Sequence, residues 1–305
     1  MTRLAALDIG TNSARLLVAD LDDAAGPLTT IDRRTRITRL GQGVNEARRL
    51  DPEAIARTLA VLEEYAQAIT EHGVSRVRMT ATSASRDASN RDEFFDPAER
   101  IVGVRPELIS GDEEAALEYA GATHELTEPE PYLLIDVGGG STEFIAGGRG
   151  PEGLISVDVG CVRLTEQYLH SDPPSPEELS VAVSVVRDHL ADVDRAIPGA
   201  AHAKTLIGTA GTVWTIGAIE LGIDASESAR IHHSRVSRAA VEEIFRTLAT
   251  ETIEQRRHNP GLEPGRVDVI VGGVIVVVAA MRHWDFDEML VSEADILDGL
   301  VRSIA

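Results

Sequence analysis

Two stretches of the chain share one pattern: Asp8-Ile9-Gly10-Thr11-Asn12-Ser13 and Asp136-Val137-Gly138-Gly139-Gly140-Ser141. Aligned on their aspartates, which lie 128 residues apart, they have Asp, an aliphatic residue, Gly and Ser at the same offsets. Each follows an aliphatic run and precedes a second strand-like run, so each predicts a β-hairpin closed by a tight turn. One such hairpin in each half favours a duplicated architecture, whose halves face each other across a cleft, over a chance match.

The residue types in these turns are suited to phosphate. Glycines let the backbone approach a ligand, the N–H groups of a tight turn hold anions, and a serine hydroxyl adds a donor. The aspartate before each turn only accepts hydrogen bonds, so it would repel phosphate unless a hard cation such as Mg²⁺ lies between them. A glycine turn can also simply reverse the chain, and the pattern leaves that interpretation open.

Glu143 follows Asp136 by seven positions, after the Gly-Gly-Gly-Ser-Thr turn. In a hairpin it lies across from that aspartate, where it could ligand the same metal or position water. A strand carboxylate that merely faces solvent fits the spacing equally well.

The composition excludes several classes of protein. The chain has 305 residues with 29 basic and 50 acidic side chains, and the formal charge of −21 disfavours nucleic acid and anionic membranes as partners. The longest uncharged apolar run, residues 269–281, is shorter than the ~18 residues of a membrane span. A single cysteine, Cys161, and the lack of a signal-like segment at the start predict a cytoplasmic protein.

Alternating strand and helix patterns place the chain in the α/β class. Asp51 and Pro52 begin a helix that ends at Gly73. Further strands are expected at 76–82, 105–110, 132–137, 154–159 and 205–208, and further helices at 112–124, 176–196, 211–221 and 237–250. Residues 266–283 fit either element, and their length favours a buried helix over a strand.

The polar stretch 125–132, with two prolines, is the best linker candidate. Apolar residues at helical spacing in the segment 294–305 predict that the chain's last residues return to the first half. We therefore predict two domains, one formed by residues 1–125 with 294–305 and the other by residues 126–293.

The run Ile109-Ser110-Gly111-Asp112-Glu113-Glu114-Ala115 begins a predicted helix. Ser110 and Glu113 form a capping-box pattern, which leaves Glu114 as the freer carboxylate. Near the positive end of a helix Glu114 would stay ionised and suit a general base, although a first-turn glutamate usually only offsets the helix dipole.

Two other features favour phosphate binding. Arg86 lies just beyond a predicted strand, where the ligand-facing loops of α/β proteins emerge, and is a better candidate than the arginine-rich stretch 33–39. Residues 208–212, Gly-Thr-Ala-Gly-Thr, stand between a strand and a helix N-terminus and form a third candidate loop.

Seven motifs occur in a characteristic order: DIGTNS (8–13), ATSASRDASN (81–90), ISGDEEA (109–115), DVGGGSTE (136–143), GCVRL (160–164), GTAGT (208–212) and PGRVDVIVGG (264–273). With them the chain resembles the exopolyphosphatase and guanosine pentaphosphate phosphohydrolase (Ppx/GppA) family over nearly its full length. The resemblance implies the duplicated actin-like and sugar-kinase-like (ribonuclease H-like) α/β fold, with two domains and an interdomain cleft.

The resemblance also implies roles for residues at matching positions. Glu114 is then the catalytic base, Asp136 and Glu143 handle the metal and water, and Arg86 lies near the substrate phosphates. Asn12, Ser13, Gly139, Gly140 and Ser141 match phosphate-loop positions. The implied metal is Mg²⁺, with Mn²⁺ as a substitute.

The activity expected from this resemblance is release of terminal orthophosphate from inorganic polyphosphate. Short chains are the expected substrate, because the sequence lacks the His-Asp signature of the extra helical domain in long members. Guanosine pentaphosphate is the alternative substrate, and a kinase or a non-catalytic polyphosphate or nucleotide sensor of the same superfamily are rival functions. A homodimer is left open. One departure is Ala210, where many relatives have glycine.

Overall fold

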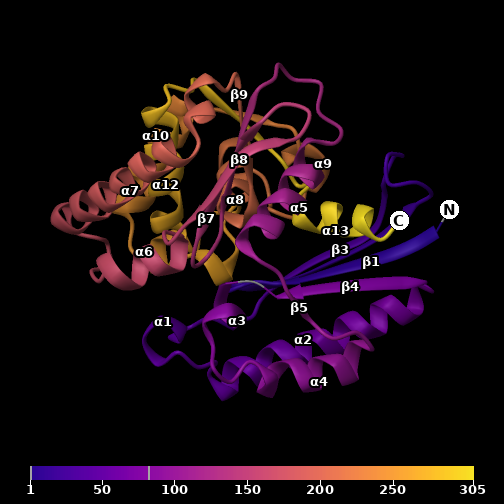
Figure 1. Cartoon of the computed structure of the whole chain (residues 1–305). Coiled ribbons are helices and arrows are strands. Elements are labelled where there is room, and N and C mark those ends of the chain that lie inside the picture. The colour runs from indigo at the N-terminus through magenta and orange to yellow at the C-terminus, as the bar shows by residue number, and fades with distance from the viewer. Residues whose placement is uncertain (1, 82) are drawn as a thin grey trace. The chain divides into compact units, whose positions relative to one another are not determined.

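A computed structural model of the chain describes residues 2–81 and 83–305, which divide into two compact units. Unit 1 consists of residues 1–124 and 294–305, and unit 2 of residues 125–293 (Figure 1). The two domains expected at 1–125 with 294–305 and at 126–293 stay a prediction, because compactness does not show that either unit folds alone.

The sheet of unit 1 has the strand order β3-β2-β1-β4-β5. β1 pairs antiparallel with β2 and parallel with β4, so the first two strands form the predicted hairpin. The strands are β1 (Thr2–Ile9), β2 (Ser13–Leu21), β3 (Thr29–Ile37), β4 (Arg76–Ala81) and β5 (Glu107–Leu108). The strand expected at 76–82 thus ends on a residue, Thr82, that lies outside the described ones.

Helices cover both faces of this sheet, because the buried side chains of β1 alternate between two cores. Ala5, Leu7 and Ile9 face one core, with α2 (Pro52–Glu71) and α4 (Asp92–Val102). Leu4 and Ala6 face the other, with α13 (Ile296–Ser303). Figure 1 shows α2 and α4 on one side of these strands and α13 on the other. Two short helices, α1 (Val44–Ala47) and α3 (Ser83–Asp87), complete the connections.

Two glycines let α13 pack against α5 (Gly111–Thr123) at very short range. A Cβ on Gly121 would lie 1.9 Å from the carbonyl oxygen of Asp295, and a Cβ on Gly299 would lie 2.1 Å from that of Leu117. The last helix is therefore held on unit 1 by backbone-to-backbone packing that only glycine permits.

The sheet of unit 2 has the order β10-β11-β9-β6-β7-β8. Its strands are β6 (Tyr132–Val137), β7 (Thr142–Gly147), β8 (Pro151–Val157), β9 (Thr205–Thr209), β10 (Arg235–Ser237) and β11 (Glu288–Val291). Read from β8, and with the edge strand β10 set aside, the strands of this sheet are the third, second, first, fourth and fifth along the chain. The sheet of unit 1, read from β3, has the same order. The repeated order confirms the predicted duplicated actin-like α/β fold.

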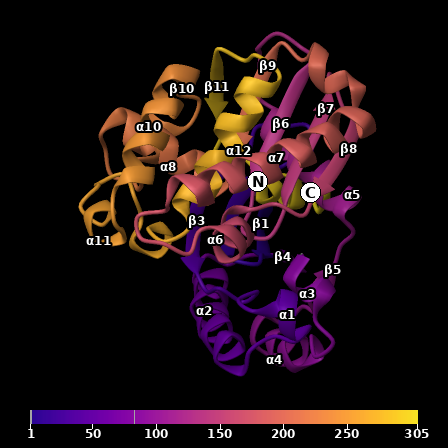
Figure 2. The ribbon, with the colours of Figure 1, turned by 90° about the vertical axis from the view of Figure 1, so that its left-hand side faces the viewer.

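Helices of unit 2 share a single core with Leu133, Ile135 and Val137, which lie on one face of β6. They are α6 (Cys161–Tyr168), α7 (Pro176–Ala196), α8 (Ala210–Leu221), α10 (Arg238–Thr250) and α12 (Ile270–His283). Figure 2 shows α7 and α12 crossing in front of the strands. The short helices are α9 (Ser228–Ile231) and α11 (Ile253–Arg256). No helix among the described residues has the length and apolar character needed to cross a membrane.

Most predicted elements of the chain are present, with shifted ends. The helix expected at 266–283 begins at Ile270, after a 3₁₀ turn at 264–266. The strand expected at 105–110 is only the two residues of β5. The sequence did not predict β3, β10, β11, α4 or α6, nor the short helices α1, α3, α9 and α11.

Replacing Gly299 by alanine tests the α5–α13 contact. Helix propensity alone favours alanine by about 1 kcal/mol. The lack of space for a methyl group should outweigh this gain, so that the free energy of unfolding falls by about 2 kcal/mol. Urea unfolding followed by circular dichroism measures the change. Gly150→Ala is the control, because no atom lies within 4 Å of its Cβ position, and equal stability of the two variants would contradict the packing described.

Candidate active site

The strand-end aspartate of unit 1 is paired with an arginine. Asp8 and Arg15 are opposite each other in the β1–β2 register, and Oδ2 of Asp8 accepts from Nη2 and Nε of Arg15 at 2.7 and 3.2 Å. Nη1 of Arg15 donates to Oδ2 of Asp295 at 2.5 Å. Arg15 thus compensates the charge of Asp8, and the expectation that the aspartate of this hairpin needs a hard cation stays a prediction.

The arginines of β3 extend this network of ion pairs. Arg33 donates to Asp298 at 2.5 Å, while Arg34 bonds Asp32. Burial raises the pKa of the Asp298 carboxyl, and the nearby Arg33 only partly opposes that shift. Two arginines of the stretch 33–39, the weaker phosphate candidate, are thus engaged with carboxylates of their own unit.

The turn of the first hairpin is held by its backbone. Gly10 donates to the carbonyl of Ser13 at 2.9 Å, and the carbonyl of Asn12 accepts from the N–H groups of Thr38 and Arg39 at 3.0 and 2.9 Å. Asn12 is buried, and its Nδ2 has no hydrogen-bond partner within the described ranges. A buried amide donor without a partner is suited to an incoming phosphate oxygen.

Glu114 and Arg86 form an ion pair in unit 1. Nη1 of Arg86 donates to Oε2 of Glu114 at 2.9 Å and to the carbonyl of Ile109 at 2.8 Å. The pair joins the N-terminal turn of α5 to α3. Both residues were predicted as site residues, but the sequence did not indicate that they touch.

The cap of α5 differs from the predicted capping box. The Ser110 hydroxyl accepts from the N–H of Glu113 at 3.1 Å, as expected. The Glu113 carboxylate instead bonds Nη2 of Arg78 at 2.9 Å. An ion pair with β4 has replaced the second half of the box, and Glu113 and Glu114 consequently bond different arginines.

In unit 2 the corresponding hairpin opposes two carboxylates. Asp136 on β6 pairs in register with Glu143 on β7, as the spacing predicts. Both side chains are buried, with 9% and 5% of their surface exposed. The Ser156 hydroxyl on β8 donates to Oε1 of Glu143 at 2.6 Å. Like charges directly opposite on a sheet repel, and a divalent cation bound to both converts that repulsion into attraction.

The glycine loop that follows β6 turns its carbonyls toward α6. The carbonyls of Gly138 and Gly139 accept from the N–H groups of Cys161 and Val162, both at 2.9 Å, and that of Gly140 accepts from Nε of Arg163 at 2.7 Å. In a trans peptide the N–H points away from the preceding carbonyl.

The N–H groups of Gly139, Gly140 and Ser141 therefore point away from α6, and none has a partner among the residues that the structure describes. Successive N–H groups on one side of a loop form an anion-binding concavity.

The third candidate loop carries a residue in the left-handed region. Ala210 has φ of 64°, and a Cβ on Gly211 would lie 2.0 Å from the guanidinium of Arg266. Arg266 is 11% exposed and bonds Glu263 at 2.7 Å. No role was predicted for Arg266, although it lies inside the motif PGRVDVIVGG (264–273).

Cys161, the single cysteine, begins α6 beside the glycine loop. Its side chain is buried, and burial raises the pKa of the thiol. A protonated buried thiol is neither a good nucleophile nor a metal ligand, so Cys161 contributes to the site through its backbone N–H.

The predicted residues fall into two groups. Unit 1 holds Asn12 and Ser13 at its turn, with Arg86 and Glu114 in contact with each other. Unit 2 holds Asp136 opposite Glu143, followed by the loop residues Gly139, Gly140 and Ser141. No cluster of three or more His, Cys, Asp or Glu side chains suited to a metal occurs within residues 2–81 and 83–305.

Comparison with known proteins identifies related chains. The sequence profile of the Ppx/GppA phosphatase family matches residues 17–305. A protein named exopolyphosphatase 2 from Mycobacterium tuberculosis is 45% identical over 317 aligned positions, covering 100% of this chain and 99% of the relative.

Solved structures are similar over the same length. An exopolyphosphatase-like protein has a TM-score of 0.93 and 35% identity, covering 100% of this chain and 98% of its own. A Ppx/GppA family member from Aquifex aeolicus has a TM-score of 0.84 and 31% identity, covering 99% and 97% of the two chains.

Arg15→Gln tests the charge compensation of the first hairpin. Its removal leaves Asp8 and Asp295 buried without their shared guanidinium, and we expect the free energy of unfolding to fall by about 3 kcal/mol. Arg36→Gln is the control, because the Arg36–Glu64 pair is solvent-exposed at 3.8 Å. Urea unfolding compares them, and adding Asp8→Asn to Arg15→Gln should recover part of the loss. Equal stability of the two single variants would count against the assignment.

Proposed function

This chain belongs to the Ppx/GppA phosphatase family, and we propose that it hydrolyses the terminal phosphoanhydride bond of short inorganic polyphosphate with Glu114 as general base and Mg²⁺ as cofactor. The observation that carries the proposal is the pair of opposed carboxylates in unit 2 beside three N–H groups that point away from α6. The first suits a cation and the second an anion, as a metal-bound phosphate requires.

Asp136 and Glu143 fit a magnesium ion by their chemistry. Mg²⁺ in proteins is commonly held by one or two carboxylates, with substrate phosphates and water as its other ligands. When bound, Mg²⁺ neutralises charge on the phosphoryl oxygens, and Mn²⁺ is expected to substitute for it.

The glycine loop binds the phosphate chain. The N–H groups of Gly139 and Gly140 and the hydroxyl and N–H of Ser141 donate to phosphate oxygens. In unit 1 the Asn12 amide and Ser13 contribute further donors. Asp8 does not repel the substrate in this scheme, because its charge is compensated by Arg15.

Glu114 takes the proton of the attacking water. The water oxygen forms a bond to the terminal phosphorus, the bridging P–O bond breaks, and the shortened chain leaves with its oxygen. Arg86, hydrogen-bonded to Glu114, positions this carboxylate and would pair with a phosphate oxygen of the substrate. The proposal requires that the two units bring Glu114 and the metal-bound phosphate to one phosphoryl group.

Guanosine pentaphosphate is the alternative substrate, because the family is defined by both activities. We favour polyphosphate as the substrate because the relative with 45% identity over the full length is named an exopolyphosphatase. We place the enzyme in the cytoplasm on account of its single cysteine, and we expect it to work without nucleic acid or a membrane. A homodimer remains a prediction to be tested by sedimentation.

Glu114→Gln tests the general base. The amide keeps the shape of the side chain but cannot take a proton from water, so kcat should fall by ~10²–10⁴, while polyphosphate binding changes little. Phosphate release measures turnover, and calorimetry on the same variant measures binding. Glu113→Gln is the matched control, because its carboxylate bonds Arg78 instead of Arg86.

The same assay run side by side on short polyphosphate, guanosine pentaphosphate and ATP ranks the substrates. Turnover of Glu114→Gln within a few-fold of wild type would assign the base elsewhere, with Glu143 as the next candidate. A higher kcat/KM for guanosine pentaphosphate would favour the alternative substrate.

Ser156→Ala tests the metal site without removing a ligand. The lost hydrogen bond frees Glu143 to rotate, and the Mg²⁺ concentration for half-maximal activity should rise by about tenfold. Ser171→Ala is the control, since Ser171 bonds Glu178 at the cap of α7. A Mg²⁺ titration after EDTA treatment gives the measurement. Full activity in EDTA would remove Asp136 and Glu143 from the metal role.

A further inference from the structure

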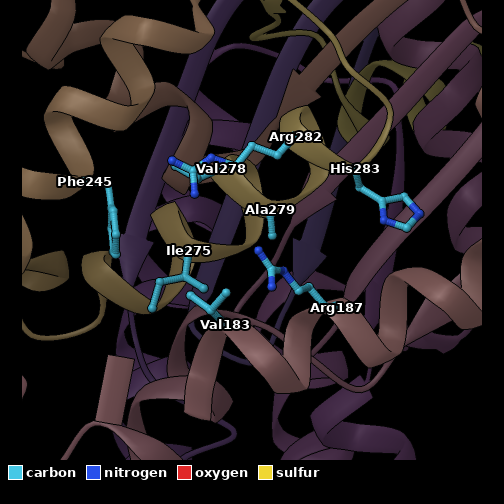
Figure 3. A pocket seen from close by; sticks show the side chains of 8 residues that line it. All are labelled: Val183, Arg187, Phe245, Ile275, Val278, Ala279, Arg282 and His283. Atoms are coloured by element: carbon cyan, nitrogen blue, oxygen red, sulfur yellow. The ribbon is translucent and has the colours of Figure 1, made fainter. Parts of the chain in front are cut away.

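A pocket of about 250 Å³ lies among three helices of unit 2, α7, α10 and α12 (Figure 3). Its apolar wall consists of Val183, Phe245, Ile275, Val278 and Ala279. Ile275, Val278 and Ala279 follow helical spacing and so form a single face of α12. None of these residues belongs to the phosphate loops or to the opposed carboxylates.

Three basic side chains also line the pocket, and they differ in their partners. Nε of Arg282 donates to Glu242 at 2.8 Å, and Nε2 of His283 lies 2.6 Å from Oδ2 of Asp194. Arg187 on α7 is exposed and has no ion pair within the described part of the chain. Figure 3 shows its guanidinium directed toward Ala279, over the apolar wall.

Arg187 lies at an apolar pocket without a carboxylate partner in the described part of a chain whose formal charge is −21. Acidic side chains are abundant, yet none pairs with Arg187 among the described residues. The N–H donors of the Arg187 guanidinium are therefore available to an anion from solution, and the apolar wall beneath it can contact an apolar group of the same ligand.

We propose that this pocket binds a small amphiphilic anion, with an apolar ring system in contact with Phe245 and Val278 and one anionic group on Arg187. A protein cavity of ~150 Å³ holds benzene, so this pocket has room for a two-ring body. Polyphosphate has no apolar part, and the pocket therefore takes a different ligand from the phosphate loops.

The dye 8-anilinonaphthalene-1-sulfonate is the probe, because it joins a naphthalene of two rings, which the pocket has room for, to one sulfonate, while its anilino ring extends beyond the part that enters. N-phenyl-1-naphthylamine is its neutral counterpart, with the same rings and no charge. Fluorescence titration of the full chain should give one saturable site for the anionic dye. Arg187→Gln should weaken that binding about tenfold and leave the neutral dye within about twofold.

Ala279→Phe should abolish binding of both dyes, because the added ring fills the pocket. Arg195→Gln is the matched control, since Arg195 is exposed on the same helix and pairs with Asp192. Circular dichroism and urea unfolding of each variant report whether it is folded. The proposal concerns only this pocket, so a failure of the proposed hydrolysis would leave it unaffected.

Several results would overturn the proposal. They are unchanged dye affinity in folded Ala279→Phe, equal weakening of both dyes by Arg187→Gln, and displacement of the dye by short polyphosphate. A dimer in sedimentation that Ala279→Phe converts to a monomer would assign the pocket to a second copy of the chain. Arg187→Gln keeps the test decisive should Ala279→Phe fail to fold, because Arg187 is exposed.

Discussion

Opposed positions on an antiparallel strand pair put two side chains on the same face of a sheet, about 5 Å apart at Cβ. Both hairpins use this constraint at the same offset: Asp8 faces Arg15 in unit 1, and Asp136 faces Glu143 in unit 2. The pair in unit 1 joins opposite charges, whereas the pair in unit 2 joins two carboxylates. A single difference at the opposed position thus separates a hairpin that supports the fold from one suited to a cation.

The glycine loop depends on α6 as much as on its own sequence. Gly160 leaves room for the loop, since a Cβ there would lie 2.6 Å from the carbonyl oxygen of Gly139. The N-terminal N–H groups of α6 then bind the loop carbonyls. A helix N-terminus often binds an anion directly, but here it orients the loop, and the N–H groups of Gly139, Gly140 and Ser141 keep no partner among the described residues.

The sequence predicted the features that repeat locally and missed those set by distant chain segments. The hairpins and the opposition of Asp136 and Glu143 follow from the period of two residues in a strand. Contact of Arg15 with Asp295 joins residues 280 positions apart, and no local pattern encodes it. β3 was missed because most of its residues are exposed or half-buried, and α4 contains Pro97 inside the helix, which a sequence pattern treats as a break.

The third loop is shaped by a neighbour and not by its own backbone preference. Ala210 adopts a left-handed conformation that costs a residue with a Cβ about 1 kcal/mol. Gly211 beside it is in contact with the guanidinium of Arg266, which a Cβ at this position would displace. The chain therefore places alanine at the strained position and glycine at the unstrained one. Alanine at 210 and glycine at 211 are expected if the close approach to Arg266 constrains the loop more strongly than the backbone strain at Ala210 does. Backbone strain of this size persists where the surrounding structure over-determines the conformation.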